Sequence, residues 1–178
     1  MNKAFLTLLL LTLPALAVPN PDAARTLVNK IIGYSLENYK QGLRIPAPFK
    51  ATASHPEDFA PEYFKLMNYF CLPSGRSWVW EMDPIWAIQL GGIEQLKIGA
   101  AKVEGTNLLF PVTYYSPNPI SSLRPGTHYA NLWIITESNG KPVLQDVRYS
   151  GEFTGGHRRS VLEELRKAKA DNPKGNQK

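Results

Sequence analysis

The dipeptide Asn139-Gly140 constrains the fold of this chain more than any other feature of its sequence. Both residues tolerate the positive φ angles that the central positions of a type I′ turn require. Residues 127–138 and 141–150 flank the dipeptide and show the pattern of β-strands. The sequence therefore predicts a β-hairpin with a two-residue turn.

A second hairpin is predicted upstream, over residues 93–104 and 107–116, which flank Gly105-Thr106. Prolines at 117, 119 and 125 separate the two hairpins and favour a longer connection between them. Four antiparallel strands are expected in total. The pairs expected around the upstream turn include Val103 with Leu108 and Ala101 with Phe110.

Helical spacing lies on both sides of these strands. Apolar residues recur at intervals of three and four over 22–41 and again over 61–71. A C-terminal helix is expected over 161–170, because Ser160 and Glu163 match a capping box. This order predicts an α+β fold, in which N-terminal helices pack on a curved antiparallel sheet of about four strands.

The expected turn also assigns each side chain of the second hairpin to a face of the sheet, because facing residues share a side. It pairs Trp133 with Asp146, Asn131 with Arg148 and Leu132 with Val147. The face expected to pack on the helices carries Ala130, Leu132, Ile134, Val143, Val147 and Tyr149, together with His128 and Gln145. The other face, expected to form an outer surface that meets a partner, carries Asn131, Trp133, Ile135, Leu144, Asp146 and Arg148.

The N-terminus has the features of a secretory signal peptide over residues 1–17. Lys3 precedes an apolar run over 4–13, and Ala15-Leu16-Ala17 forms a small-residue cleavage site. The run is about half the length that a bilayer-spanning helix needs, so no membrane anchor is expected after cleavage. We therefore expect an exported protein, periplasmic or secreted, with one domain over 18–170 and a disordered basic tail over 171–178.

The charge of the chain is mildly basic, with 20 Lys and Arg residues against 15 Asp and Glu and a formal net charge of +5. The basic residues concentrate near the C-terminus, where a solvated helix face and a loose tail account for them. Nucleic acid is therefore not an expected partner.

The cysteine and histidine content argues against several kinds of site. Cys71 is the only cysteine, so the chain forms no intramolecular disulfide, and its apolar surroundings in sequence favour an inert buried thiol. The three histidines, His55, His128 and His157, show no recognisable metal-ligand spacing. Neither a metal nor another cofactor is predicted.

Several short segments in a defined order link the chain to a known superfamily. They are Asp83-Pro84, Gln89, the hairpin over 98–103 and 108–114, residues 132–137, the Asn139-Gly140 turn and residues 143–147. With them the chain resembles the nuclear transport factor 2-like superfamily over residues 22–168, and it looks most like small exported bacterial domains of unknown function within it. The resemblance implies a cystatin-like cone fold and leaves activity open, because the superfamily includes enzymes, binding modules and interaction domains.

Two classes of site are compatible with this cone. A proton-transfer enzyme of the isomerase or dehydratase kind needs a pocket base, for which the candidates are His128 and Asp83. A binding module needs only an apolar interior with a few polar contacts. Its candidate ligand-binding residues are Tyr114, His128, Leu132, Gln145 and Tyr149.

A protein partner is the remaining alternative, and it would bind the outer face of the second hairpin. Its candidate interface residues are Asn131, Trp133, Asp146 and Arg148. Both faces of the first hairpin are fairly apolar, which favours a homodimer that covers one of them. The sequence as a whole favours an exported, non-catalytic domain that binds a small apolar ligand or a protein, with the proton-transfer enzyme as the alternative.

Overall fold

The computed structural model describes residues 17–40, 54–70, 85–86, 92–117, 126–150 and 158–171. Within these residues it contains three α-helices and one six-stranded sheet. The predicted α+β class and the C-terminal helix are confirmed, whereas the strand count is six instead of four. The proposed signal peptide, the basic tail beyond residue 171, Cys71 and Asp83 lie outside the described residues.

Helix α1 (Pro21–Lys40) forms where the first helical spacing predicts it. Asn20 caps its start, because the Asn20 Oδ1 atom accepts the N–H groups of Asp22 at 2.9 Å and of Ala23 at 3.1 Å. The buried side chains of α1 share one face and contribute to the core. They are Ala24, Leu27, Val28, Ile31 and Ile32.

Helix α3 (Pro61–Tyr69) follows a short 3-10 helix, η1 (Pro56–Asp58). Pro61 occupies the first turn of α3, where its missing N–H group costs no hydrogen bond. The segment between η1 and α3 is joined to the sheet, because the Ala60 N–H donates to the Leu144 carbonyl at 2.8 Å.

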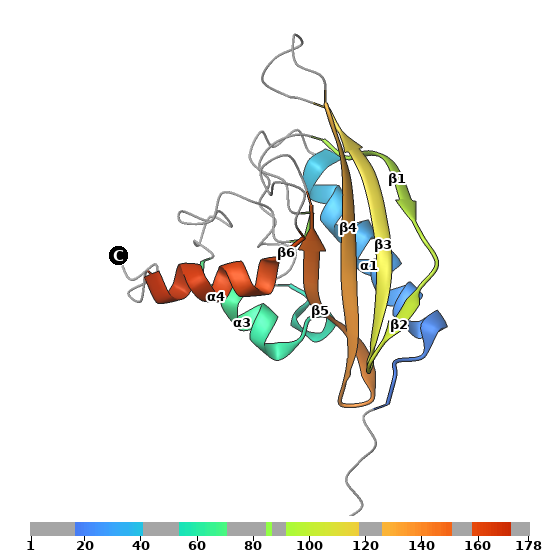
Figure 1. Cartoon of the computed structure of the whole chain (residues 1–178), viewed down its shortest axis with the longest axis vertical. Helices are drawn as coiled ribbons and strands as arrows, with labels where there is room; N and C mark the ends of the chain where they lie inside the picture. Colours follow the sequence, from blue (N-terminus) through green and yellow to red (C-terminus); the bar gives the residue numbers. More distant parts are fainter. Residues whose placement is uncertain are drawn as a thin grey trace, which may run out of the picture.

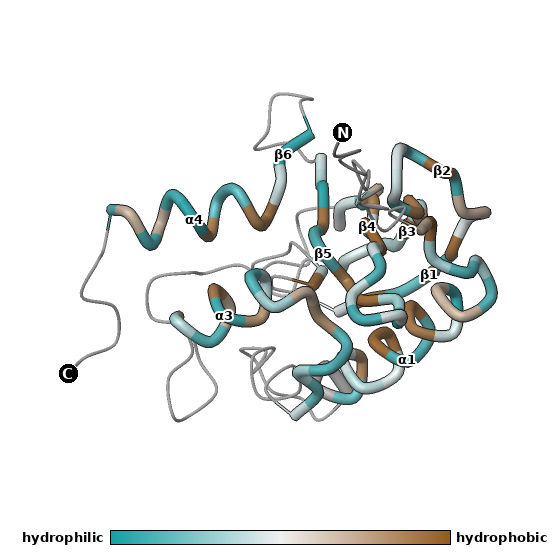
Figure 2. Tube along the Cα trace, turned by 90° about the horizontal axis from the view of Figure 1, so that it is seen from below, coloured by the Kyte–Doolittle hydropathy of each residue, from teal (hydrophilic) through white to brown (hydrophobic). Residues whose placement is uncertain are grey.

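The sheet is antiparallel, with the order β1-β3-β4-β5-β6 and with β2 paired to β3. Figure 1 shows α1 crossing one face of this sheet, while α3 and α4 lie together beside β5. Figure 2, seen from below, shows the same separation of α1 from the α3–α4 pair. The strands are β1 (Glu94–Ile98), β2 (Lys102–Glu104), β3 (Asn107–Ser116), β4 (Thr127–Ser138), β5 (Lys141–Tyr149) and β6 (Arg159–Ser160).

The upstream hairpin explains one of the two additional strands. The pair Val103–Leu108 forms as predicted, but the expected first strand is divided into β1 and β2. At the division the Gly99 N–H donates to the Pro111 carbonyl at 2.7 Å, and Ala101, expected opposite Phe110, lies outside both strands. The other additional strand, β6, has two residues and is too short to show a period.

The downstream hairpin has the predicted turn but not the predicted register. Asn139 and Gly140 have φ angles of 52° and 74°, as a type I′ turn requires. The pairs from Ser138–Lys141 to Ile135–Leu144 follow the expected register. A bulge at Gln145 then shifts the pairing by one residue, so that Trp133 pairs with Val147 instead of Asp146.

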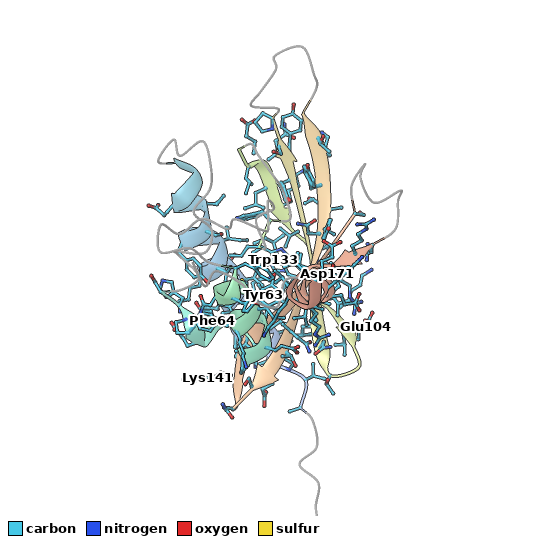
Figure 3. The ribbon with its side chains drawn as sticks, turned by 90° about the vertical axis from the view of Figure 1, so that its left-hand side faces the viewer. Tyr63, Phe64, Glu104, Trp133, Lys141 and Asp171 are labelled. Atoms are coloured by element: carbon cyan, nitrogen blue, oxygen red, sulfur yellow. The ribbon has the colours of Figure 1, made fainter. Side chains whose placement is uncertain are left out.

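The inner face, defined as the face of the sheet that packs on α1, is the opposite of the expected one on β4. Trp133 and Ile135 are fully buried there, in the same core cluster as Ile31 of α1. Figure 3 shows Trp133 between α1 and the strands. Beyond the bulge the β5 side chains change sides, so Val147 and Tyr149 join Trp133 on the inner face.

Helix α4 (Val161–Asp171) begins at a cap formed by two residues. Ser160 Oγ accepts the Glu163 N–H at 3.0 Å, as the capping box predicts. The carboxylate of Asp146 on β5 adds a second cap, because it accepts the Leu162 N–H at 2.9 Å and the Ser160 hydroxyl at 2.7 Å. Strand β5 therefore determines where α4 starts.

Candidate functional site

A group of polar and aromatic side chains lies on the inner face of the sheet, and we call it the interior polar cluster. It consists of Tyr114 from β3, Tyr129, Asn131 and Trp133 from β4, and Trp86 from the short described segment 85–86. The strand residues share a face because side chains alternate along a strand and because Tyr114 pairs with Tyr129. Trp86, Tyr114, Asn131 and Trp133 are buried to 99% or more.

Hydrogen bonds join part of this cluster around one backbone oxygen. The side-chain amide of Asn131 donates to the Trp86 carbonyl at 2.8 Å and to Tyr114 Oη at 3.2 Å. The Tyr114 hydroxyl donates to the same Trp86 carbonyl. These contacts hold the Asn131 side chain in one orientation, because its amide nitrogen is shared between two acceptors.

The aromatic rings of the cluster contact one another at edges and faces. Trp86 meets Tyr114 and Trp133 edge-on, with centroid distances of 5.4 Å and 5.5 Å. Tyr114 stacks on Tyr129 at 5.1 Å. Such arrangements are the preferred geometries of aromatic pairs and fix the rings relative to one another.

Polar atoms of two β4 residues in the cluster have no hydrogen-bond partner among the described residues. They are the Asn131 Oδ1 atom, an acceptor, and the Trp133 Nε1 atom, a donor, and both are buried. A buried polar group without a partner costs about 1 to 3 kcal/mol. The two residues are neighbours on one face of β4, with Cα atoms roughly 7 Å apart along the strand, so the cluster presents an unpaired acceptor and an unpaired donor on the same face.

No family model, curated protein or solved structure matches this chain. Among the helices that the structure describes, none is both long and apolar enough to span a bilayer.

The predicted ligand-binding residues are divided between the two faces of the sheet. Tyr114 and Tyr149 lie on the inner face, but the Tyr149 hydroxyl donates to Glu164 of α4 at 2.7 Å. Burial, and then the Glu164 carboxylate, raise the pKa of Tyr149. Leu132 and His128 lie on the opposite face, and Gln145 is the bulged residue. Only Tyr114 belongs to the interior polar cluster.

The predicted protein interface does not form a common surface. Asn131 and Trp133, expected on the outside, are buried in the core because β4 turns the opposite face to the helices. Asp146 is buried at the start of α4. Arg148 is half-exposed on the other face, where it forms an ion pair with Glu104 of β2 at 3.3 Å. The assignment of Asn131 and Trp133 to the outer face is therefore wrong.

Of the two candidate bases, His128 lies in the described part of the chain, and its side chain is on the face of the sheet opposite the interior polar cluster. His128 is exposed, with its ring 5.0 Å from that of Tyr115, and both side chains point away from the inner face. Asp83 lies outside the described residues.

Sequence reasoning placed none of Trp86, Tyr129, Asn131 and Trp133 at a ligand site, and two of these residues show why. Trp86 comes from a stretch with no hydrophobic period, so nothing in the sequence indicates what its backbone carbonyl contacts. Asn131 carried a usable signal, because it is a single amide between the apolar residues Ala130 and Leu132 in a strand. A polar residue in that context often serves a buried hydrogen-bond network.

Proposed function

We propose that this protein is an exported, non-catalytic binding domain with a nuclear transport factor 2-like cone fold, which holds a small neutral ligand at the interior polar cluster. The observation that carries the proposal is the pair of unpartnered buried atoms, Asn131 Oδ1 and Trp133 Nε1. Buried polar atoms are nearly always hydrogen-bonded in native proteins. A bound molecule with one donor and one acceptor would supply the missing hydrogen bond of each atom.

The chemistry of the cluster defines the ligand. Three aromatic rings, those of Trp86, Tyr114 and Trp133, favour a planar or largely apolar molecule. The cluster contains amide, phenol and indole groups and no charged side chain. A charged ligand would lose its hydration without gaining a counter-charge there, so a neutral one is favoured.

Among the described residues, the composition of the cluster favours binding over proton transfer. Amide and indole groups do not titrate near neutral pH, and an unperturbed phenol titrates near pH 10. The candidate base His128 lies on the opposite face of the sheet. A ligand held at Asn131 would therefore not reach its imidazole.

Loss of one hydrogen bond at the cluster tests this function. N-phenyl-1-naphthylamine, a neutral aromatic amine whose fluorescence rises in apolar surroundings, provides the probe. We expect Asn131→Leu, which removes the acceptor for the probe's N–H group, to weaken binding about tenfold, because a net hydrogen bond is worth about 1 kcal/mol or more. Trp133→Phe, which retains an aromatic ring without the donor, tests the second polar atom with ligands that carry an acceptor.

The matched control is Ile134→Val. Ile134 follows Trp133 in the strand, is equally buried and points to the other face, so it reports the effect of a small core change on binding. Equal probe affinity in the wild-type, Asn131→Leu and Ile134→Val proteins would contradict the proposal. Native mass spectrometry of protein purified from its own host would identify a retained natural ligand.

The homodimer stays a prediction. Light scattering of the purified protein measures the mass directly, and a monomer at all concentrations would contradict the dimer.

A further inference from the structure

A second group of ionisable side chains lies away from the interior polar cluster, where α1 faces the segment that precedes α3. We call it the ionic cluster. It consists of Lys30 and Tyr34 of α1 together with His55, Glu57 and Asp58. One ligand atom from each of His55, Glu57 and Asp58 lies within 4.8 Å of the others, and the His55 Nδ1 to Glu57 Oε1 distance is 3.5 Å.

Asp58 is the most informative member of this cluster. Asp58 is only 4% exposed, yet one of its carboxylate oxygens, Oδ2, has no hydrogen-bond partner among the described residues. The other oxygen, Oδ1, accepts the Lys30 ammonium at 2.8 Å. Burial, and then the nearby Asp58 carboxylate, raise the pKa of the Tyr34 phenol, but its hydroxyl has no hydrogen-bond partner among the described residues. A buried carboxylate is costly unless both oxygens are satisfied, so Oδ2 is open to a further group.

The backbone holds the three candidate ligands, His55, Glu57 and Asp58, close together. The Asp58 N–H donates to the His55 carbonyl at 3.2 Å and the Phe59 N–H donates to the Pro56 carbonyl at 3.3 Å, which closes the turn of η1. The next residue, Ala60, is bonded to strand β5. The His55 ring stacks on Tyr34 at 4.5 Å and 19°, which orients the imidazole.

Lys30 already supplies a positive charge to this site. Its ammonium lies 2.8 Å from Asp58 and 3.3 Å from Glu57, and hydrogen bonding to Asp58 raises the pKa of Lys30. The Lys30 side chain is 44% exposed on a flexible stem, so it can move into solvent when another cation arrives.

We propose that His55, Glu57 and Asp58 form a binding site for a divalent transition metal, with zinc as the best match. One imidazole nitrogen and two carboxylate oxygens suit Zn²⁺, whereas Mg²⁺ and Ca²⁺ prefer oxygen ligands alone. Tetrahedral coordination by three protein ligands leaves the fourth position for a water molecule. The sequence predicted no metal, because the ligand positions 55, 57 and 58 match no familiar spacing motif.

Calorimetric titration of the untagged full-length protein with ZnCl₂ tests this site. We expect binding in the wild-type protein and at least about tenfold weaker binding in His55→Ala and in Asp58→Asn, because even the loss of an outer-shell partner has an effect of that size. Lys30→Met should bind about tenfold more tightly, since it removes the competing positive charge and the repulsion that Lys30 would exert on the metal. MgCl₂ should give no binding at the same concentrations.

The matched control is His128→Ala, which removes an exposed histidine on the sheet face opposite α1 and should bind zinc as the wild type does. Absence of zinc binding in the wild type, or undiminished binding in His55→Ala, would overturn the proposal. So would a loss of binding in His128→Ala alone. If the buried Asp58→Asn variant does not fold by circular dichroism, the surface variants His55→Ala and Lys30→Met decide the question.

Discussion

Three polar side chains of the second hairpin are buried in the core and form hydrogen bonds with neighbouring elements. Tyr149, Asp146 and Asn131 all lie in the second hairpin, and each has a polar group buried against a neighbouring element. In two cases the partner is in α4, whereas Asn131 bonds to the Trp86 carbonyl. The polar groups therefore specify which elements pack together, while the apolar residues supply most of the buried area.

Tyr149 gives a prediction about pH. Its folded-state pKa is raised, so its stabilising contribution is complete below the unfolded pKa of about 10 and is lost as the pH rises above that value. We expect Tyr149→Phe to lower the free energy of unfolding by about 1 to 2 kcal/mol at pH 7, through the lost hydrogen bond to Glu164. The difference between variant and wild type should shrink above pH 10.

Urea unfolding at pH 7 and at pH 11 measures this difference. A double-mutant cycle with Glu164→Gln isolates the contribution of the pair from other titrating groups. If Tyr149→Phe were equally destabilising at both pH values, the assigned role of the phenol would be incorrect.

At the scale of elements, α4 depends on β5 for its first turn. The Asp146 carboxylate accepts the Val147 and Leu162 N–H groups and the Ser160 hydroxyl, at 2.8, 2.9 and 2.7 Å. Helix α4 also contacts α3, where Arg166 makes a bidentate ion pair with Glu62. Both ends of that pair are half-exposed, so it contributes less than the buried cap.

We therefore expect Asp146→Ala to lower the free energy of unfolding by about 2 kcal/mol and to speed amide exchange in the first turn of α4. Urea unfolding and hydrogen exchange at Leu162 and Glu163 measure the two effects. Asp171→Ala, an exposed carboxylate at the other end of the same helix, is the control. Unchanged exchange at Leu162 in Asp146→Ala would show that the cap does not hold α4.

The elements were predictable where one local signal decided them. Helix α1 followed from its period, α4 from Ser160, and the second hairpin from Asn139-Gly140. The bulge at Gln145 was not predictable, because no turn residue marks it. Both faces of the hairpin are also apolar, since Ile134 and Val143 are buried opposite Trp133. Hydrophobic alternation then cannot decide which face packs on the helices.

The candidate sites were predictable only in part, because local sequence patterns do not show which distant segments of the chain meet. Tyr114 was identified because it lies in a long regular strand. The interior polar cluster also needs Trp86, and the ionic cluster needs α1 to approach the segment at 55–58. Both depend on contacts between distant parts of the chain, which no local pattern encodes.

At the scale of the whole molecule, the proposed export requires that the start of the fold tolerate cleavage after Ala17. The cap of α1 is Asn20, and Pro19 is buried, so a cut at this position leaves both in place. We expect the chain expressed with its own N-terminus in a bacterial host to be recovered outside the cytoplasm with the mass of residues 18–178. Intact-mass measurement of the fractionated cells gives the result.

The control for export is Ala17→Arg, which places a large charged residue at the cleavage position and should leave the precursor uncut. A wild-type protein that retained its full mass in the cytoplasm would contradict the assignment of residues 1–17.

Helix α1 lies near the start of the chain, yet its buried face packs against β5, which is among the last elements to be synthesised. The core therefore cannot close until nearly the whole chain is available. Folds that depend on such distant contacts form slowly compared with those built from local ones. The proposed export is compatible with this topology, because a core that closes late leaves the chain open for passage through a narrow translocation channel.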